Sequence, residues 1–444
     1  MADSRVRGCS QDRVIYPRTS RTDLDKGIPI IVRAEGVRIF DQDGKAYLDL
    51  VSGWTRPVHV GYGRHEIAQA VTDQILAMPY YTPMQFGNPR AVELAAVLAG
   101  LAPRPIGHFL FVSSGSEAVE SALKLAKHYH HYRGERARFK VITRRGAFHG
   151  VTGGALRVLG TVLPIRQMME PLAPGTIFAE SPYCYRCPLH LTYPACDLAC
   201  ARDVERLIQF EDPSQVMAFV GEPIQQAFGV CAPPREYWPI IREICDRHGI
   251  LLIVDEVISG FGRTGRWFAS EHFEIRPDLM TMAKGISSGY VPMGAVGASD
   301  AVVQPVEHFA NLQTYMNHPV ACAASLANIE ILQRERLIER SSDMGGYFLD
   351  RLRSLERHAI VGEARGAGLW AALELTTNKA THAPFPPASL GRIVDRARER
   401  GLIIKAMNMA LEFAPPLVIG RTDIDEAVRI LDGCLSEEGQ ALGL

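Results

Sequence analysis

The chain has 444 residues, of which 47% are hydrophobic and 22% charged, and its formal net charge is −1 at pH 7. A chain of this length can bury an extensive core, and its near-neutral charge balance offers no strongly basic surface for nucleic acid. No apolar run is long enough to span a bilayer, and the N-terminal stretch 1–9 lacks the apolar core of a signal peptide. We therefore expect a cytoplasmic protein that binds neither nucleic acid nor membrane.

The first sixty residues predict short strands separated by turns. The extended stretch Ile31–Phe40 precedes Asp41–Gly44, a polar segment ending in glycine that is typical of a hairpin turn. From about residue 61 to 315, helical stretches alternate with short apolar strands. This alternation indicates an α/β protein whose mainly parallel sheet is covered by helices on both faces.

A strand, a turn and a helix follow one another between residues 109 and 132. Phe109–Val112 predicts a short buried strand and Glu117–Tyr132 an amphipathic helix, with Ser113–Ser116 as the tight turn between them. Glycine and serine at a helix N-terminus present free N–H groups, a hydroxyl and the positive end of the helix dipole to an anion. Gly115 and Ser116 are therefore candidate phosphate ligands. The alternative is an ordinary N-cap, in which serine serves helix stability alone.

An aromatic residue and a glycine follow the next predicted strand, Lys140–Thr143. In the segment Ala147–Gly150, Phe148 can stack on a planar cofactor ring and Gly150 lets the backbone approach it closely. A phenylalanine packed in the core is the alternative.

Four of the nine cysteines fall in one segment, at Cys184, Cys187, Cys196 and Cys200. Two close pairs of thiols suit a tetrahedral zinc site, although the gap between the pairs is short beside common zinc ribbons. Free thiols in a loop, disulfides and zinc therefore all remain open. In a cytoplasmic enzyme these thiols are expected to stay reduced, and we favour free thiols in a loop over the sheet and assign no metal ligand.

An acid and a later lysine predict pyridoxal phosphate chemistry. Asp255 ends the buried strand pattern that follows a helix at Tyr237–Gly249, and Lys284 stands between an apolar run and small residues. This chemistry needs a carboxylate that keeps the pyridine nitrogen protonated and an amine that holds the cofactor aldehyde as a Schiff base. Each residue alone also suits a strand-end cap or a surface charge, and it is their joint context that favours the cofactor.

The glycines of Gly260–Gly265 match the dinucleotide fingerprint GxGxxG. A dinucleotide site would open a helix directly after its strand and carry an acidic residue at the end of a second strand. Here Asp255 and Glu256 separate the strand from the glycines, and no clear second strand follows. We therefore do not expect a nicotinamide oxidoreductase.

Six segments in this order resemble the motif set of the class III (ω) aminotransferases, and the similarity runs from about residue 25 to the C-terminus. They are Ser113–Ala118, Ala147–Gly150, Glu222-Pro223, Asp255–Gly265, Ala283–Gly285 and Thr314–Ala324. The resemblance implies fold type I of the pyridoxal phosphate enzymes, the aspartate-aminotransferase-like fold. Its large, mainly parallel-sheet cofactor domain would span 61–315, and its small α+β domain would combine 1–60 with 316–444, a region that begins with a helix predicted at Pro319–Leu332.

The resemblance also implies roles for single residues. Lys284 would hold pyridoxal 5'-phosphate as a Schiff base, and Asp255 would contact the pyridine nitrogen. Thr314 resembles a threonine that reaches the phosphate of the neighbouring subunit, which implies a homodimer with shared active sites. The remaining cofactor contacts are Gly115 and Ser116 at the phosphate, Phe148 and Val257 on the two faces of the ring, and His149 and Glu222.

The expected substrate site departs from the family pattern at two positions. Many members that use glutamate and 2-oxoglutarate carry an arginine two residues before an Ala-Pro-Pro segment, and a glutamate five residues after the glutamate of Glu-Pro. The matching positions here are Glu412 and Ala227. A carboxylate at 412 would repel a substrate carboxylate, so we do not expect that arginine route. The alternative is a local slip of the alignment, with Glu412 a solvated charge.

Other candidates for substrate contact lie near the expected entrance. Arg56 either binds the carboxylate of a keto acid or is a surface arginine. Trp54 and Phe86 either line an aromatic substrate pocket or pack in the core. Ile258 stands where relatives that use 2-oxoglutarate often have glutamine and the amine:pyruvate branch often has isoleucine.

We therefore expect a pyridoxal phosphate aminotransferase that moves an amino group from an amine or ω-amino acid to a keto acid, with pyruvate as the acceptor. The alternative on the same scaffold is a racemase or epimerase, which would return the proton to the other face of the same carbon. A non-enzymatic cofactor-binding module is a third class, and the presence of both Lys284 and Asp255 argues against it.

Overall fold

The computed structural model describes residues 13–17, 19–25, 27–161 and 164–444. The N-terminal stretch 1–9, from which we expect no signal peptide, lies outside these residues. In the part of the chain that is described, no helix is both long and apolar enough to cross a membrane.

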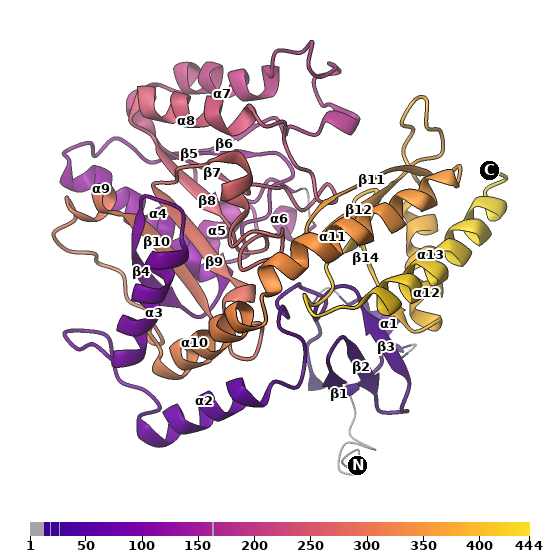
Figure 1. Cartoon of the computed structure of the whole chain (residues 1–444). Coiled ribbons are helices and arrows are strands. Elements are labelled where there is room, and N and C mark those ends of the chain that lie inside the picture. The colour runs from indigo at the N-terminus through magenta and orange to yellow at the C-terminus, as the bar shows by residue number, and fades with distance from the viewer. Residues whose placement is uncertain (1–12, 18, 26, 162–163) are drawn as a thin grey trace.

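A seven-stranded sheet forms the centre of the larger part of the molecule, in the order β4-β10-β9-β8-β7-β5-β6 (Figure 1). Neighbouring strands are parallel except at β10, which runs antiparallel to both β4 and β9. The expected α/β fold with a mainly parallel sheet is confirmed. The strands are β4 (Ile106–Val112), β5 (Lys140–Arg144), β6 (Thr176–Ala179), β7 (Val216–Gly221), β8 (Leu251–Asp255), β9 (Leu279–Ala283) and β10 (Gly294–Ser299).

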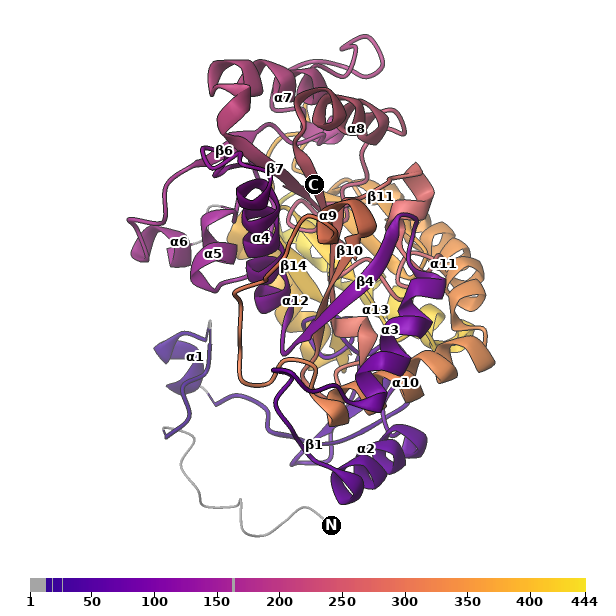
Figure 2. The same ribbon diagram turned by 90° about the vertical axis from the view of Figure 1, so that its left-hand side faces the viewer.

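Helices cover both faces of this sheet because its central strands are apolar on both sides. In β8, Leu251 and Ile253 belong to the apolar cluster of α4, whereas Leu252 and Val254 belong to that of α7 and α8. The helices of this part are α2 (His65–Ala77), α3 (Pro89–Leu101), α4 (Gly115–Tyr132), α5 (Gly153–Arg157), α6 (Pro164–Met168), α7 (Ala199–Phe210), α8 (Tyr237–His248), α9 (Asp300–Val303) and α10 (Pro319–Arg334). Figure 2 shows α7 and α8 at one end of the molecule and α2 at the other.

The helix before β8 ends where the sequence predicts. Gly249 follows α8 with a φ of +62°, a left-handed conformation in which glycine avoids the steric cost of a side chain. The chain then reverses directly into β8, whose last residue is Asp255. A local capping signal therefore sets the position of a candidate catalytic carboxylate.

Two smaller sheets bring the chain ends together. One has the order β1-β2-β3-β13, so a C-terminal strand pairs in parallel with the N-terminal hairpin, and the other has the order β11-β12-β15-β14. The predicted turn at Asp41–Gly44 joins β2 to β3, while a further reversal at Gly36 divides the extended stretch Ile31–Phe40 into β1 and β2. These strands are β1 (Ile31–Glu35), β2 (Arg38–Asp41), β3 (Ala46–Asp49), β11 (Val361–Ala367), β12 (Trp370–Leu375), β13 (Leu402–Ile403), β14 (Lys405–Met407) and β15 (Ala410–Phe413).

The remaining helices pack on these sheets or connect the elements. Figure 1 shows α11 beside β12 and α13 beside α12 in the part built from the chain ends, whose boundaries at residues 60 and 315 stay a prediction. The α-helices are α1 (Arg21–Asp25), α11 (Leu337–Arg353), α12 (Pro387–Glu399) and α13 (Arg421–Ala441). The short 3-10 helices are η2 (Cys184–Arg186), η3 (Pro213–Gln215), η4 (Ala269–Phe273), η5 (Lys284–Ile286) and η6 (Ser354–Arg357).

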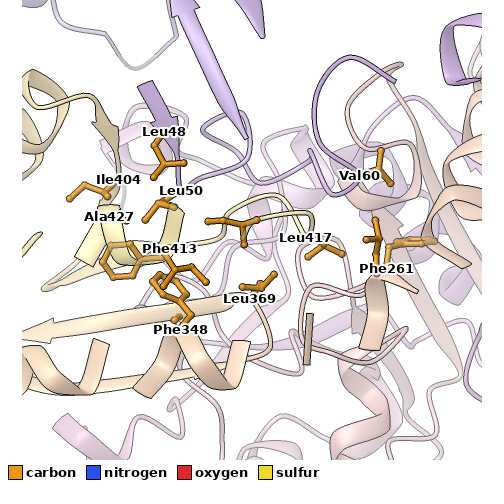
Figure 3. Close-up of a cluster of buried hydrophobic side chains, with 14 of the residues drawn as sticks. Leu48, Leu50, Val60, Phe261, Phe348, Leu369, Ile404, Phe413, Leu417 and Ala427 are labelled. Atoms are coloured by element: carbon orange, nitrogen blue, oxygen red, sulfur yellow. The ribbon is translucent and has the colours of Figure 1, made fainter. Parts of the chain in front are cut away.

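A continuous apolar cluster joins the two parts of the molecule (Figure 3). Leu50 from the N-terminal segment lies near Phe413 of β15, and Leu417 extends the cluster toward Phe261. Backbone hydrogen bonds add to this packing, since the amide of Ala414 donates to the carbonyl of Leu50 at 2.7 Å. The loop after β3 and the segment after β15 are therefore fixed against each other.

The cysteine-rich segment follows β6, and none of its residues lines the cavity described below. Its four thiols are free and line one small cavity, and Cys184 is exposed. Within the described residues, no three His, Cys, Asp or Glu side chains are arranged to hold a metal ion.

Candidate active site

A cavity of about 350 Å³ opens at the carboxyl edge of the large sheet. Its walls come from segments that follow β4, β5, β7, β8 and β9, because strands running in one direction bring their carboxyl ends to one edge. The sequence-predicted residues that line it are Gly115, Ser116, Phe148, His149, Glu222, Asp255, Val257, Ile258 and Lys284. This cavity is therefore the candidate active site.

The N-terminus of α4 forms an anion-binding corner of the cavity. Ser114 caps the helix, its hydroxyl oxygen accepting from the amide of Glu117 at 3.2 Å, while the Glu117 carboxylate accepts from the amide of Ser113 at 2.8 Å. The capping role therefore belongs to Ser114. Gly115 and Ser116 are first-turn residues whose amides have no acceptor within the helix. Their amides would meet an anion at the positive end of the helix dipole.

Close packing explains the glycine at this corner. A Cβ built on Gly115 would lie 2.9 Å from Cγ1 of Val257, and one on Gly150 would lie 2.5 Å from Oγ of Ser116. Both distances are shorter than van der Waals contact allows. Side chains at these two positions would push apart the walls that carry Val257 and Ser116.

Asp255 is held in one orientation at the cavity wall. Its Oδ2 pairs with Nδ1 of His149 at 2.7 Å, and its Oδ1 accepts from the amide of Val257 at 3.0 Å. Both side chains are almost completely buried. Glu222 lies in the same wall, where burial raises the pKa of its carboxyl and the amide of Phe148 donates to it at 3.4 Å. The segment 147–150 thus contacts both acids.

Lys284 enters the cavity from the end of β9 in a left-handed backbone conformation, with a φ of +47°. Burial, and next the positive charge of Arg56, lower the pKa of its amine to about 8. A substantial share of the amine is therefore neutral near physiological pH, which is the state required of a nucleophile. Within the described residues its Nζ makes no hydrogen bond or ion pair.

Arg56 and Glu412 form a buried ion pair beside the cavity. Nε of Arg56 donates to Oε1 of Glu412 at 2.6 Å and its Nη2 donates to Oε2, so the contact is bidentate. The side chains are only 5% and 0% exposed. Burial favours a raised pKa for Glu412, but the charge and hydrogen bonds of Arg56 outweigh it and hold that pKa below the usual value.

This pair corrects three sequence-based interpretations. Glu412 is not a solvated charge and Arg56 is not a surface arginine, because both are buried. The expected repulsion between Glu412 and a substrate carboxylate also needs revision, since the charge of Glu412 is balanced by Arg56. Ala227, at the position where many members of the family carry a glutamate, is buried, with only 5% of its surface exposed.

Three sequence candidates do not line the cavity of the single chain. Trp54 and Phe86 are 50% and 57% exposed, so neither packs in the core of the chain. Lys405 lies over the Trp54 ring at 5.5 Å. Thr314 is exposed, and its carbonyl accepts a hydrogen bond from the hydroxyl of Tyr80. All three lie on the molecular surface, where only another molecule can cover them.

Sequence reasoning missed residues that the fold brings to the site. The segment 287–293 passes Lys284 and lines the cavity. In the sequence, only the small residues after the lysine indicated a close approach of this segment. Gln226 and Trp370 both donate to Glu412, at 3.1 and 2.8 Å. No local pattern marks these two residues.

The residues present fit pyridoxal phosphate. An anion-binding helix N-terminus, an oriented carboxylate and an amine without a protein partner line the same cavity, with Phe148 and Val257 as apolar surfaces for a ring. Gly115, Ser116, Asp255 and Lys284 would hold the group, and a Cβ at Gly115 would disturb the wall that receives it.

Known proteins of similar sequence and structure are aminotransferases. A family model described as aminotransferase class-III matches residues 21–435. The chain is 39% identical over 441 residues to a putrescine–pyruvate aminotransferase of Pseudomonas aeruginosa, covering 98% of this chain and 96% of that protein. It is 36% identical over 435 residues to a taurine–pyruvate aminotransferase of Bilophila wadsworthia, covering 94% of each. A solved ω-transaminase of Pseudomonas jessenii in complex with PMP has a TM-score of 0.93 at 32% identity, covering 97% of this chain and 98% of that chain.

Replacing Lys284 should abolish covalent cofactor attachment. In Lys284→Ala, borohydride treatment followed by peptide mass spectrometry should find no cofactor-modified residue, and turnover should fall by about 100-fold or more because the proton-transfer group is lost. Lys124→Ala, on the exposed side of α4, is the control and should match the wild type. A reducible linkage elsewhere in the Lys284 variant would contradict the assignment.

The amine of Lys284 should titrate near pH 8 in the cofactor-free protein. Labelling by an amine-specific reagent should rise through that midpoint, because only the neutral amine reacts. In the double variant Arg56→Gln and Glu412→Gln the midpoint should move up. Arg56 lowers the pKa of Lys284 more than Glu412 raises it. Removing both charges should therefore raise that pKa. An unchanged midpoint would show that Arg56 does not act on Lys284.

Proposed function

The chain belongs to the class III aminotransferases, and on that premise we propose that it moves an amino group from a primary amine or ω-amino acid to pyruvate. Class III aminotransferases depend on pyridoxal 5'-phosphate. The racemase alternative has no support, since the relatives reported above are aminotransferases.

When bound, pyridoxal phosphate supplies the ring that accepts the electron pair left at the substrate carbon. The chain's own residues complete the chemistry. Nζ of Lys284 takes the proton from that carbon as a general base and, as a general acid, would deliver it to the cofactor carbon that carries the transferred nitrogen, a role that its lowered pKa suits. Asp255, oriented by His149, places a negative charge where the ring nitrogen keeps its proton. The first turn of α4 binds the phosphate.

The observation that carries the choice of acceptor is the buried ion pair of Arg56 and Glu412. 2-Oxoglutarate brings two carboxylates into the site and pyruvate brings one, and each buried carboxylate needs a cationic or hydrogen-bonding partner. No arginine is among the described residues that line the cavity. Position 412 holds a glutamate, so it offers no guanidinium for a second carboxylate. The site therefore favours an acid with a single carboxylate.

The proposed donors follow from the same site and from the relatives. Ile258 and Ile224 make part of the cavity wall apolar, which suits an alkyl chain beside the reacting amine. The two named relatives act on putrescine with pyruvate and on taurine with pyruvate. A primary amine or an ω-amino acid is therefore the donor class that we propose.

We also propose that the active form is a homodimer. Large apolar residues are exposed around the 80–86 and 312–315 loops, where Tyr80 contacts Tyr315 and Tyr81 contacts Phe86. Such a patch favours burial against another surface. Exposed Thr314 lies in the same region, where it would reach the cofactor phosphate of the partner, and Trp54 and Phe86 would line the shared entrance.

Pyruvate should be preferred over 2-oxoglutarate. With putrescine or taurine as donor, kcat/KM for pyruvate should exceed that for 2-oxoglutarate by about tenfold or more, because the second carboxylate finds no partner. Initial rates of coupled alanine and glutamate formation measure both acceptors. A preference for glutamate and 2-oxoglutarate would contradict the proposed acceptor while leaving the cofactor assignment intact.

Loss of the Thr314 hydroxyl should weaken cofactor retention. Thr314→Ala removes a hydrogen bond to a charged phosphate, so the cofactor Kd should rise by about tenfold or more. Cofactor absorbance after gel filtration measures retention, and Thr381→Ala, an exposed threonine on another loop, is the matched control. Sedimentation velocity of the wild type tests the dimer directly, and a fully active monomer would refute the shared site.

A further inference from the structure

The Arg56–Glu412 ion pair lies within electrostatic reach of the reacting lysine. Pro57, the residue after Arg56, lines the cavity, and after burial the charge of Arg56 is the next cause of the lowered pKa of Lys284. An anionic substrate group that approaches Lys284 therefore meets the field of this guanidinium.

Glu412 keeps hydrogen-bond donors that do not depend on Arg56. Nε1 of Trp370 donates to Oε1 at 2.8 Å, and Nε2 of Gln226 donates to Oε2 at 3.1 Å. Each carboxylate oxygen thus has one neutral donor in addition to the arginine. If Arg56 leaves, both oxygens of Glu412 remain hydrogen-bonded, which reduces the cost of leaving that carboxylate alone.

Arg56 is fixed at its backbone but has one partner at its guanidinium. Its loop is held in left-handed conformations, with φ of +46° at Ser52, +66° at Trp54 and +70° at Arg56, and Asp49 accepts hydrogen bonds from two of the loop amides. Among the described residues, the guanidinium hydrogen-bonds to Glu412 alone, through Nε and Nη2. Hydrogen bonds to Asp49 thus hold the loop backbone, while the long side chain depends on a single carboxylate.

We propose that Arg56 is the carboxylate-binding residue of this site and that Glu412 is its internal counter-anion, which the carboxylate of the 2-oxo acid displaces. The proposal rests on the proposed function and specifies its acceptor site. In the resting protein Arg56 is paired with Glu412. When the acceptor enters, the guanidinium turns to its carboxylate, and Glu412 stays bound to Trp370 and Gln226.

Exchange of one carboxylate for another explains why this motion is feasible. Breaking a buried ion pair without replacement leaves uncompensated charge in a medium of low dielectric constant and is strongly unfavourable. Replacing Glu412 with a substrate carboxylate preserves a bidentate arginine–carboxylate pair. The exchange therefore costs the difference between two similar pairs and the loss of the charge partner of Glu412, which the hydrogen bonds from Trp370 and Gln226 offset in part. An uncharged group offers no replacement pair and cannot cause the exchange.

The same pair explains how one cavity accepts both substrates of the reaction. An amine donor without an anionic group leaves Arg56 on Glu412, so no unpaired cation faces its alkyl chain. The 2-oxo acid that follows brings its own anion and takes Arg56. Specificity for the two half-reactions is thus set by whether the substrate carries an anion that can displace Glu412.

The test measures the two half-reactions separately in the holoenzyme. The double variant Arg56→Gln and Glu412→Gln removes both charges together and so avoids leaving either one unpaired. For pyruvate reacting with the amine-loaded enzyme, KM should rise by about tenfold or more, because a bidentate charge pair is lost. The half-reaction with putrescine, which carries no anion, should lose much less, by about threefold at most.

The single variant Glu412→Gln tests the counter-anion role. It removes the competitor for Arg56 while preserving shape, so KM for pyruvate should fall by about threefold or more. Glu438→Gln is the matched control, since Glu438 is also fully buried and paired with arginines, Arg392 and Arg396, but does not line the cavity. It should leave both half-reactions as in the wild type. An unchanged pyruvate KM in both the double and the Glu412→Gln variants would overturn the proposal and make the pair purely structural.

Two further measurements separate this proposal from the proposed function. Calorimetric titration with propanoate, an unreactive carboxylate, should give a Kd about tenfold higher in the double variant, and equal affinities would overturn the proposal even if no donor reacts. A wild type that is inert to all donors but binds propanoate through Arg56 would contradict the proposed function alone.

Taurine, whose sulfonate offers the same anion chemistry, tests the donor side. A loss confined to taurine, with pyruvate unaffected, would overturn the assignment to the acceptor.

Discussion

The direction of five strands places the functional side chains of this protein. β4, β5, β7, β8 and β9 run the same way, so the segments that follow them meet at one edge of the sheet. A polar cavity there depends on an apolar interior beneath it, because the central strands are buried on both faces and carry mainly apolar side chains before their ends. Asp255 at the last position of β8 and Lys284 just after β9 are direct results of this constraint.

Charge compensation is the second condition that the site satisfies. Burial is the main cause that lowers the pKa of Lys284 to about 8 and that of Arg263 to about 9, and it also raises the pKa of Glu222. Arg263 is stabilised by the carbonyls of Leu369 and Pro415. The acids and bases of the cavity therefore influence one another, and removing a single charge would change the protonation of several others.

The part built from both chain ends supplies the buried pair that we propose for substrate binding. Arg56 follows β3 and Glu412 lies in β15, and the apolar cluster of Leu50, Phe413 and Leu417 fixes their segments against each other. The large sheet thus supplies the groups that suit the cofactor, while the chain ends supply the groups that we propose for the acceptor. Substrate choice can change in this arrangement without altering the cofactor residues.

The sequence by itself determined the α/β fold, the family and nine of the residues that line the candidate active site, because these depend on local signals. A strand followed by a glycine-containing helix start, or by an acid, predicts the same local structure regardless of which distant segments pack against it. Only the tertiary structure decided that Arg56 and Glu412 form a buried pair, that Ser114 is the helix cap and that Trp54 and Phe86 are exposed. Arg56 and Glu412 are 356 positions apart, and each had been assigned a separate role. No short-range pattern specifies a contact over that separation, because it results from the pairing of β3 with β13 and from packing between the two chain ends.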